Sequence, residues 1–112
     1  MPAKGYFSVT QLWGFLMAAD RKRAVLINLN AETDFVSKGD DFKNFLGNSL
    51  KLLLEKQIDV DLQKGNSQIE SLLKEVRYDS SNTMEESTKL LIAKTKEKVE
   101  FSKILAFTGS RL

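Results

Sequence analysis

The first third of the chain carries the apolar pattern of β-strands. Residues 6–18 mix aromatic and β-branched side chains, and Gly14 within them indicates a bulge or a point where another segment approaches closely. After a charged turn at 20–23, residues 24–30 form a second expected strand, which is apolar on both faces around Val25–Ile27. Strands of that kind are typical of the covered interior of a sheet. We therefore predict an antiparallel hairpin whose second strand is central.

The middle of the chain changes to a helical period. Apolar residues recur at steps of three, four and seven over residues 40–57, which predicts an amphipathic helix with Leu50 in the middle of its apolar face. A Gly-Asn pair at 65–66 indicates a loop, and Ser67–Glu70 has the form of a capping box. The apolar stripe over Ile69–Val76 then predicts a second helix.

The last third returns to a strand. Thr83–Glu86 is another capping-box sequence and opens a helix that we expect to reach about Lys98. Phe101, Ile104, Leu105 and Phe107 predict a third strand, closed by Thr108–Gly109. The order strand, strand, three helices, strand predicts an α+β fold, a small antiparallel sheet of about three strands covered on one side by helices. With 112 residues, the chain suits a single domain over residues 1–112.

The composition removes several classes of site. The chain has no cysteine and no histidine, so disulfides, Cys/His zinc sites and His-based catalysis are excluded. There is no Walker-type phosphate loop. Sites built on Asp, Glu or Lys are left open by composition alone. We expect no enzymatic activity, no cofactor and no bound metal.

The charge balance argues against a nucleic-acid partner, and the length of the apolar runs argues against a membrane span. The 17 basic and 15 acidic residues nearly balance, which is not the footprint of a nucleic-acid-binding surface. Arg21–Arg23 is interpreted as a solvated turn rather than as a phosphate-contacting cluster. The apolar run Leu12–Ala19 is too short to span a bilayer, and a buried strand is preferred to the core of a signal peptide.

The most specific stretch lies where the second predicted strand ends. It reads Asn28-Leu29-Asn30-Ala31-Glu32-Thr33-Asp34-Phe35-Val36. This resembles the signature of elongation factor Ts, the nucleotide exchange factor of elongation factor Tu. The family signature is a hydrophobic strand, Glu-Val-Asn, a small residue, Glu or Gln, and then Thr-Asp-Phe-Val. Gly14 also matches a glycine in the family's first strand.

A second signature is altered. Near the end of the third helix the family reads Lys, apolar, Gly-Glu-Asn, apolar. Here Lys94, Glu97 and Val99 match, whereas Lys96 and Lys98 stand at the glycine and asparagine positions. The resemblance covers about residues 8–109 and corresponds to the amino-terminal half of the family's core. We therefore expect a fragment, a split product or a reduced relative.

The resemblance implies a function and a partner. In the family, the Asp-Phe pair enters elongation factor Tu beside its nucleotide site and promotes GDP release during translation elongation. Carried over, Asp34 and Phe35 would be the intruding pair, Thr33 would cap the turn, and Val36 would anchor it in the core. The residues alone leave another interpretation open, in which Phe35 is a core residue and Asp34 only favours a helix N-terminus.

Two other functions are weighed against nucleotide exchange. One is a structural or protein-interaction module that kept the fold and lost exchange activity, which the altered second signature favours. The other is a basic-hairpin RNA-binding domain, which the balanced charge disfavours. The family works in bacterial cytoplasm and in organelles. The departures around Gly14 and in residues 96–103 favour a mitochondrial protein, with bacterial cytoplasm or a plastid as alternatives.

Overall fold

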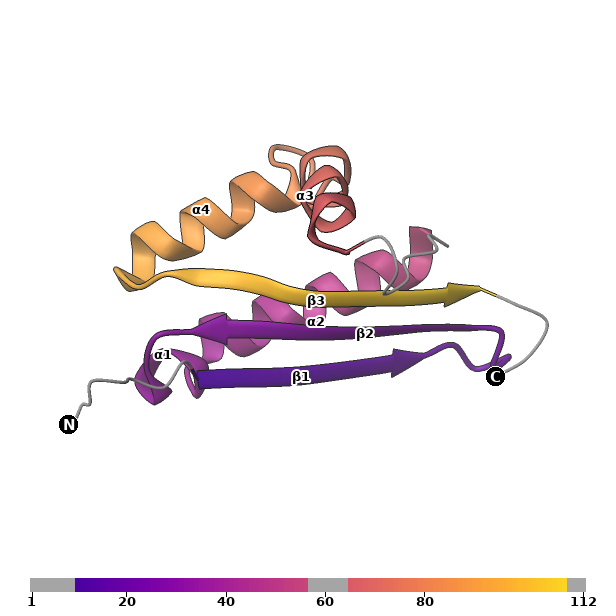
Figure 1. Cartoon of the computed structure of the whole chain (residues 1–112), viewed down its shortest axis with the longest axis horizontal. Helices are drawn as coiled ribbons and strands as arrows, with labels where there is room; N and C mark the ends of the chain where they lie inside the picture. The colour runs from indigo at the N-terminus through magenta and orange to yellow at the C-terminus, as the bar shows by residue number, and fades with distance from the viewer. Residues whose placement is uncertain (1–9, 57–64, 109–112) are drawn as a thin grey trace.

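The computed structural model describes residues 10–56 and 65–108, which form a three-stranded sheet and four helices (Figure 1). The sheet is antiparallel throughout, with the strand order β1-β2-β3. The α+β class and the central place of the second strand are therefore confirmed. The elements are β1 (Thr10–Met17), β2 (Arg23–Ala31), α1 (Asp34–Ser37), α2 (Asp40–Lys56), α3 (Gly65–Glu75), α4 (Met84–Thr95) and β3 (Val99–Thr108).

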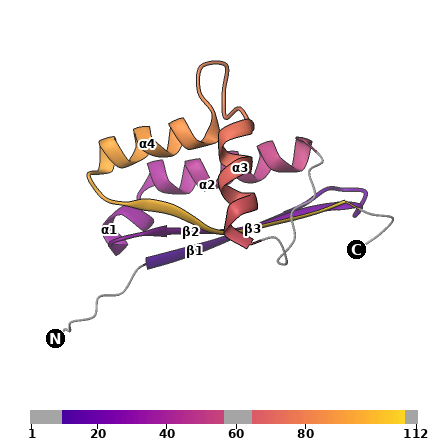
Figure 2. The ribbon, with the colours of Figure 1, turned by 45° about the horizontal axis from the view of Figure 1, so that its top comes forward.

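The helices cover one face of the sheet, as predicted (Figure 2). Helix α2 packs against β1 and β2, and α3 and α4 pack against β3 and against each other. Between the layers, the largest fully buried side chains include Ile27 and Leu29 of β2 and Phe42 and Leu53 of α2. Burying side chains of this size stabilises the fold by roughly 1.5–3 kcal/mol each.

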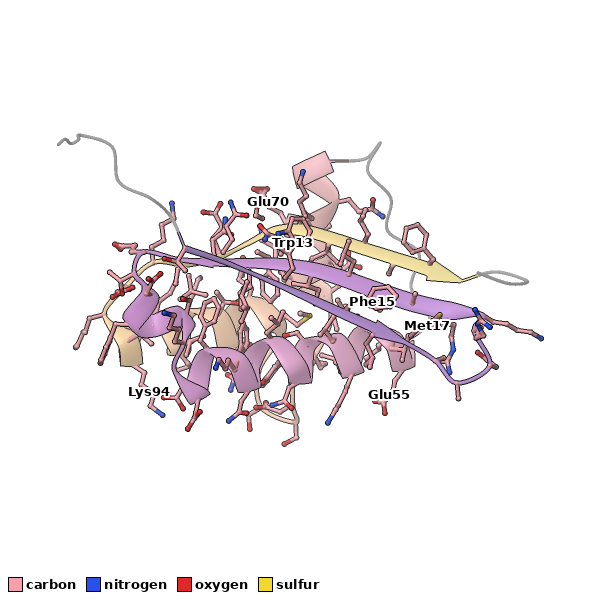
Figure 3. The ribbon with its side chains drawn as sticks, turned by 90° about the horizontal axis from the view of Figure 1, so that it is seen from below. Trp13, Phe15, Met17, Glu55, Glu70 and Lys94 are labelled. Atoms are coloured by element: carbon pink, nitrogen blue, oxygen red, sulfur yellow. The ribbon has the colours of Figure 1, made fainter. Side chains whose placement is uncertain are left out.

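The other face of the sheet carries large apolar side chains in the open. Because side chains alternate along a strand, Leu12 and Leu16 of β1 face the helices, whereas Trp13, Phe15 and Met17 point away from them and are exposed (Figure 3). The sheet therefore has a helix-covered face and an open apolar face.

Gly14 is a point of close approach, which was one of the two roles predicted for it. A Cβ atom built there would lie 2.7 Å from Leu50 Cδ1 and 3.1 Å from Leu46 Cγ of α2. The pairing of β1 with β2 has no shift in register, so the bulge alternative is wrong for Gly14. The described bulge lies between β2 and β3, at Asn28 and Leu29.

Strands β1 and β2 differ from the predicted ranges by one residue at an end, and three other boundaries differ more. Helix α3 begins at Gly65, so the pair at 65–66 is helical and Ser67 is not the residue before the helix. Helix α4 ends at Thr95 because Lys96 adopts the left-handed conformation, and β3 starts at Val99. The capping box of Thr83 and Glu86 is confirmed by both of its hydrogen bonds. Residues 6–9 and Gly109 lie outside the described residues.

None of the helices in the described part of the chain has both the length and the apolar character needed to cross a membrane.

Candidate functional site

The predicted tetrad forms a single helical turn, α1, at the end of β2. Thr33 is extended (φ −135°, ψ 159°) and is the N-cap, and its Oγ1 accepts a hydrogen bond of 3.5 Å from the Val36 N–H. Asp34 stands in the first turn, where the helix dipole favours a carboxylate. Val36 is buried in the main core. The turn is thus capped at one end and fastened to the core at the other, as the sequence indicated.

Phe35 points out of this turn and is 88% exposed, more than any other large apolar side chain in the described residues. The interpretation of Phe35 as a core residue is therefore wrong. The helical turn accounts for this, because it directs consecutive side chains in different directions, so that Val36 is buried and Phe35 is not. Leaving a phenylalanine in water forgoes roughly 1.5–3 kcal/mol of burial. A partner surface would recover that free energy.

Asp34 is exposed beside Phe35, and its carboxylate is oriented by a neighbouring strand. Its Oδ1 atom accepts a hydrogen bond of 2.9 Å from the hydroxyl of Thr10, the first described residue of β1. The bond holds one carboxylate oxygen against the sheet. Asp34 and Phe35 therefore stand together on a fixed turn instead of on a free loop.

Glu97, which is distant in sequence, accepts two hydrogen bonds from Thr33. Its Oε1 accepts a hydrogen bond of 3.0 Å from the Thr33 N–H, and its Oε2 accepts one of 2.6 Å from the Thr33 hydroxyl. A reciprocal bond of 3.1 Å runs from the Lys98 N–H to Glu32 Oε2. We call these three bonds the carboxylate clamp. They bring together the two segments in which the sequence resembled a known family.

The hydrogen bonds of the carboxylate clamp can form because the end of β2 lies beside the start of β3. Ala31 pairs with Val99, so the segment that follows β2 meets the segment that precedes β3 at the same end of the sheet (Figure 1). Sequence reasoning named Glu97 only as a matching residue. The contact itself joins residues 64 positions apart, and no local pattern reveals it.

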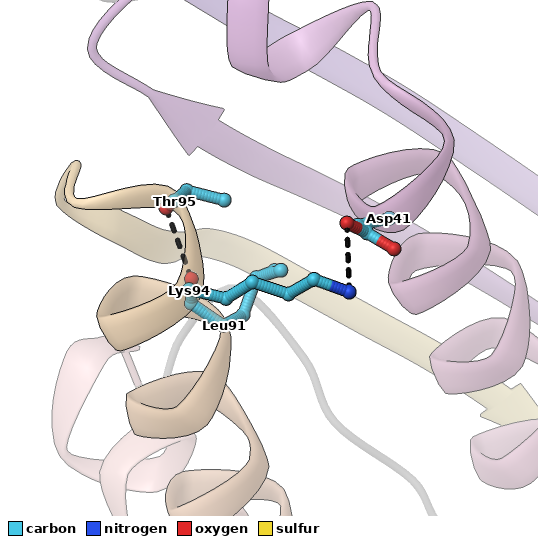
Figure 4. A network of polar contacts seen from close by, with 4 residues as sticks. All are labelled: Asp41, Leu91, Lys94 and Thr95. Atoms are coloured by element: carbon cyan, nitrogen blue, oxygen red, sulfur yellow. Dashed lines mark hydrogen bonds and ion pairs between the residues drawn. The ribbon is translucent and has the colours of Figure 1, made fainter.

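The turn between α4 and β3 is shaped by Lys96. Its backbone is left-handed (φ 64°, ψ 19°), and its N–H donates a hydrogen bond of 2.8 Å to Ile92 O. Beside it, the Thr95 hydroxyl donates a hydrogen bond of 2.9 Å to Leu91 O (Figure 4). The Lys96 N–H thus satisfies one of the last four carbonyls of the helix, and the left-handed residue turns the chain towards Glu97.

Lys94, another residue that matches the second signature, forms an ion pair of 3.1 Å with Asp41 at the start of α2 (Figure 4). Both side chains are more than half exposed, so solvent screens the pair and its contribution to stability is small. It does, however, link the last turn of α4 to the helix that follows the tetrad.

The basic hairpin does not form a compact cluster. Arg23 is half-buried, and its guanidinium donates a hydrogen bond of 2.9 Å to Leu54 O in the last turn of α2. Arg21 and Lys22 are exposed at the turn, as expected of a solvated hairpin. Arg23 therefore stabilises a helix C-terminus, and only two of the three basic side chains face solvent.

The tetrad is a protrusion and not a pocket. A hollow of about 590 Å³ lies between α3, α4 and β3, and none of the four residues lines it. The described residues contain no group of three or more acidic, histidine or cysteine side chains arranged to hold a metal ion. What the turn offers is an exposed aromatic ring next to a hydrogen-bonded carboxylate, which suits contact with another macromolecule.

The sequence of this chain is similar to a known protein family and to several of its members. A family model described as Elongation factor TS matches residues 32–111. The chain is 32% identical over 94 residues to elongation factor Ts of Nitrosomonas eutropha, covering 84% of this chain and 29% of that protein. For the Aquifex aeolicus protein the identity is 32% over 88 residues, with 79% and 30% covered. For that of Clostridium acetobutylicum it is 33% over 91 residues, with 80% and 27% covered.

The chain thus spans about 30% of the length of the curated relatives it matches. The range matched by the family model includes both Thr33–Val36 and Glu97. The resemblance drawn from the sequence is confirmed.

Proposed function

The chain belongs to the elongation factor Ts family, and from this premise we propose that it acts in translation elongation. The proposed activity is binding to elongation factor Tu and promotion of GDP release. Because the chain spans about 30% of its relatives' length, this activity is a proposal for the chain itself. The observation that carries it is Phe35, 88% exposed beside Asp34 on a capped and tethered turn.

Exchange of this kind needs no catalytic side chain. If the chain binds nucleotide-free elongation factor Tu more tightly than the GDP-bound form, it must weaken GDP binding by the same factor. No covalent bond is made or broken. The absence of histidine and cysteine is therefore no obstacle.

The two exposed residues have different roles in this proposal. Phe35 is the anchor, because an aromatic ring that moves from water into a partner's pocket supplies most of the binding free energy of a small contact. Asp34 brings a negative charge close to the phosphates and magnesium of the bound nucleotide. Thr33 and Val36 hold the turn and are not expected to touch the partner with their side chains.

A second candidate function is a protein-interaction module without exchange activity. The observation that favours it is the open face of the sheet, where Trp13, Phe15 and Met17 are exposed. Contiguous exposed apolar side chains mark surfaces that contact other proteins. An interaction through that face would not involve the tetrad, so substitutions in the tetrad separate the two functions.

The relatives named above come from bacteria, which favours bacterial cytoplasm among the three compartments considered. Mitochondrial and plastid locations stay predictions.

The test is release of fluorescent GDP from elongation factor Tu, with and without the chain. Phe35→Ala should reduce binding to the nucleotide-free partner by about 2 kcal/mol, which is about 30-fold, and should slow GDP release. Its unfolding free energy should change by less than about 0.5 kcal/mol, because the ring is already in water. Phe15→Ala is the matched control, since that ring is also exposed, at 59%, but lies on the open face of the sheet.

The outcomes discriminate between the candidates. Slower GDP release with Phe35→Ala but not with Phe15→Ala supports exchange through the tetrad. An unmutated chain that leaves GDP release unchanged contradicts the exchange function and favours the interaction module. Micromolar binding of GDP to the chain alone, measured by calorimetry, would also contradict it, because an exchange factor of this kind acts on the partner's nucleotide site.

A further inference from the structure

The carboxylate clamp joins two segments and also fixes the conformation of Thr33. Both oxygens of Glu97 are used on one residue, Thr33, and both bonds are charge-assisted. The bond of 2.6 Å from the Thr33 hydroxyl is short, as expected when a hydroxyl donates to a carboxylate. Because Glu97 accepts hydrogen bonds from both the N–H and the hydroxyl of Thr33, it fixes the backbone and the side-chain rotamer of that residue.

Fixing that rotamer sets the helix cap. A threonine hydroxyl has one proton and two lone pairs. Since its proton is directed to Glu97, its lone pairs are left for the Val36 N–H, which lies 3.5 Å away. The cap of α1 is thus oriented by a carboxylate from the other end of the chain.

Helix α1 needs such support. It has four residues, and an isolated helix of one turn is unstable in water because nucleation is costly. Besides its own backbone hydrogen bonds, its supports are burial of Val36 and Ser37, the bonds from Thr10 and from the Ser37 hydroxyl to Asp34, and the clamp. Phe35 contributes no burial of its own.

We propose that Glu97 is a positioning residue for the exposed pair, holding the Thr33–Val36 turn in the conformation that presents Phe35 before any partner arrives. This rests on the proposed function, because it assigns Glu97 a role in the same contact. Glu97 acts only through Thr33. A turn that is preformed for a tenth of the time would bind about tenfold more weakly than one that is always formed.

The test uses three variants of the full chain. Glu97→Ala removes both acceptors. Glu97→Gln keeps one carbonyl oxygen for the Thr33 N–H, and its amide nitrogen is close enough to bond the Thr33 hydroxyl. Glu55→Ala is the matched control, since it removes the same charge from an exposed position. Glu55 lies near the C-terminal end of α2, whereas Lys94 lies near the N-terminal end of that helix (Figure 3).

The first readout needs no partner. Amide hydrogen exchange, followed by NMR, should accelerate at least tenfold for Thr33 and Val36 in Glu97→Ala, and should be unchanged for Ile27 in the centre of the sheet. Glu97→Gln should restore most of the protection, and Glu55→Ala should alter none of it. Unchanged exchange at Thr33 and Val36 in Glu97→Ala would overturn the proposal, whatever the partner assay gives.

The second readout is the rate of GDP release from elongation factor Tu. Glu97→Ala should reduce the stimulation by about tenfold, and Glu97→Gln should recover most of it. In a chain that already carries Phe35→Ala, adding Glu97→Ala should have little further effect, because both changes remove the same contact. Independent, multiplying effects of the two changes would show that Glu97 acts elsewhere and overturn the positioning role.

Failure of the proposed function is a distinct result. If the unmutated chain does not stimulate GDP release, the exchange function is contradicted. Loss of protection at Thr33 and Val36 in Glu97→Ala would then still support Glu97 as the residue that holds the turn.

Discussion

Lys96 occupies a backbone conformation that normally belongs to glycine. Its φ of 64° is left-handed, and it is the C-cap of α4. The residue is exposed, and its ammonium forms no ion pair among the described residues. The signature of the elongation factor Ts family has glycine at this position, and the structure gives a physical reason for that choice. We therefore predict that Lys96→Gly stabilises the chain.

The magnitude follows from two opposing terms. A side chain with a Cβ pays about 1–2 kcal/mol in the left-handed region, and glycine does not. Glycine in turn loses more conformational freedom on folding, which offsets about 0.4–1 kcal/mol of the gain. The hydrogen bond of 2.8 Å from the residue-96 N–H to Ile92 O is a backbone bond and is kept. The net expected gain is about 1 kcal/mol, or about 4 °C in Tm for a domain of this size.

The assay is urea unfolding, in which the midpoint should rise while the slope stays the same. Arg21→Gly is the matched positive control, since Arg21 is also exposed and has a φ of 62° in the hairpin turn. Lys98→Gly is the negative control, because Lys98 does not have positive φ, and it should lose stability. If Lys96→Gly lowers the midpoint while Arg21→Gly raises it, left-handed strain is not what limits the α4 C-terminus.

Two further predictions concern the contact between β1 and α2, and both are measured as unfolding free energies from urea titrations. Leu50→Ala should cost about 2–5 kcal/mol because Leu50 is only 8% exposed, and a midpoint equal to that of the unmutated chain would show that this helix face is not the buried one. Gly14→Ala should cost about 1–3 kcal/mol, since its Cβ would lie 2.7 Å from Leu50 Cδ1. In the double variant the new methyl group takes space that Leu50 vacates, so the combined cost should be below the sum, and strict additivity would refute the close approach.

Periodicity, residue composition and capping sequences predicted most of the fold. The three strands and the three long helices have apolar patterns long enough to reveal their type, as in the 17-residue helix α2. Helix α1 has four residues and no period, so only its cap chemistry could be seen in the sequence. The end of α4 was misplaced because no glycine or proline marks it, and a lysine takes the left-handed position instead.

The candidate site was predicted in part. The sequence located Thr33–Val36 at a strand end followed by a helix start, and the structure places them there. Whether Phe35 is buried or exposed was not decidable from the residues, because a phenylalanine one position before a buried valine fits either orientation of a single turn. The hydrogen bonds between Thr33 and Glu97 were not predicted, because they depend on the pairing of β2 with β3.

The pairing of β2 with β3 explains why two short segments, far apart in sequence, meet as a clamp. Ala31 lies opposite Val99, and continuing the same antiparallel register places Glu32 opposite Lys98 and Thr33 opposite Glu97. These are the pairs that bond, with carboxylates accepting the Lys98 and Thr33 N–H groups where carbonyls would accept them in a sheet.

The β-bulge between β2 and β3 determines this register. Asn28 pairs with Lys103 but Leu29 pairs with Phe101, so one residue of β3, Ser102, has no residue opposite it. If Ser102 instead paired with Leu29 in a regular ladder, Glu100 would stand opposite Ala31 and the basic Lys98 would stand opposite Thr33. A carboxylate reaches the N-cap only because the ladder is shifted by one residue. Bulges recur beside functional sites, where they redirect a side chain, and here the bulge brings Glu97 to the residue that orients the exposed pair.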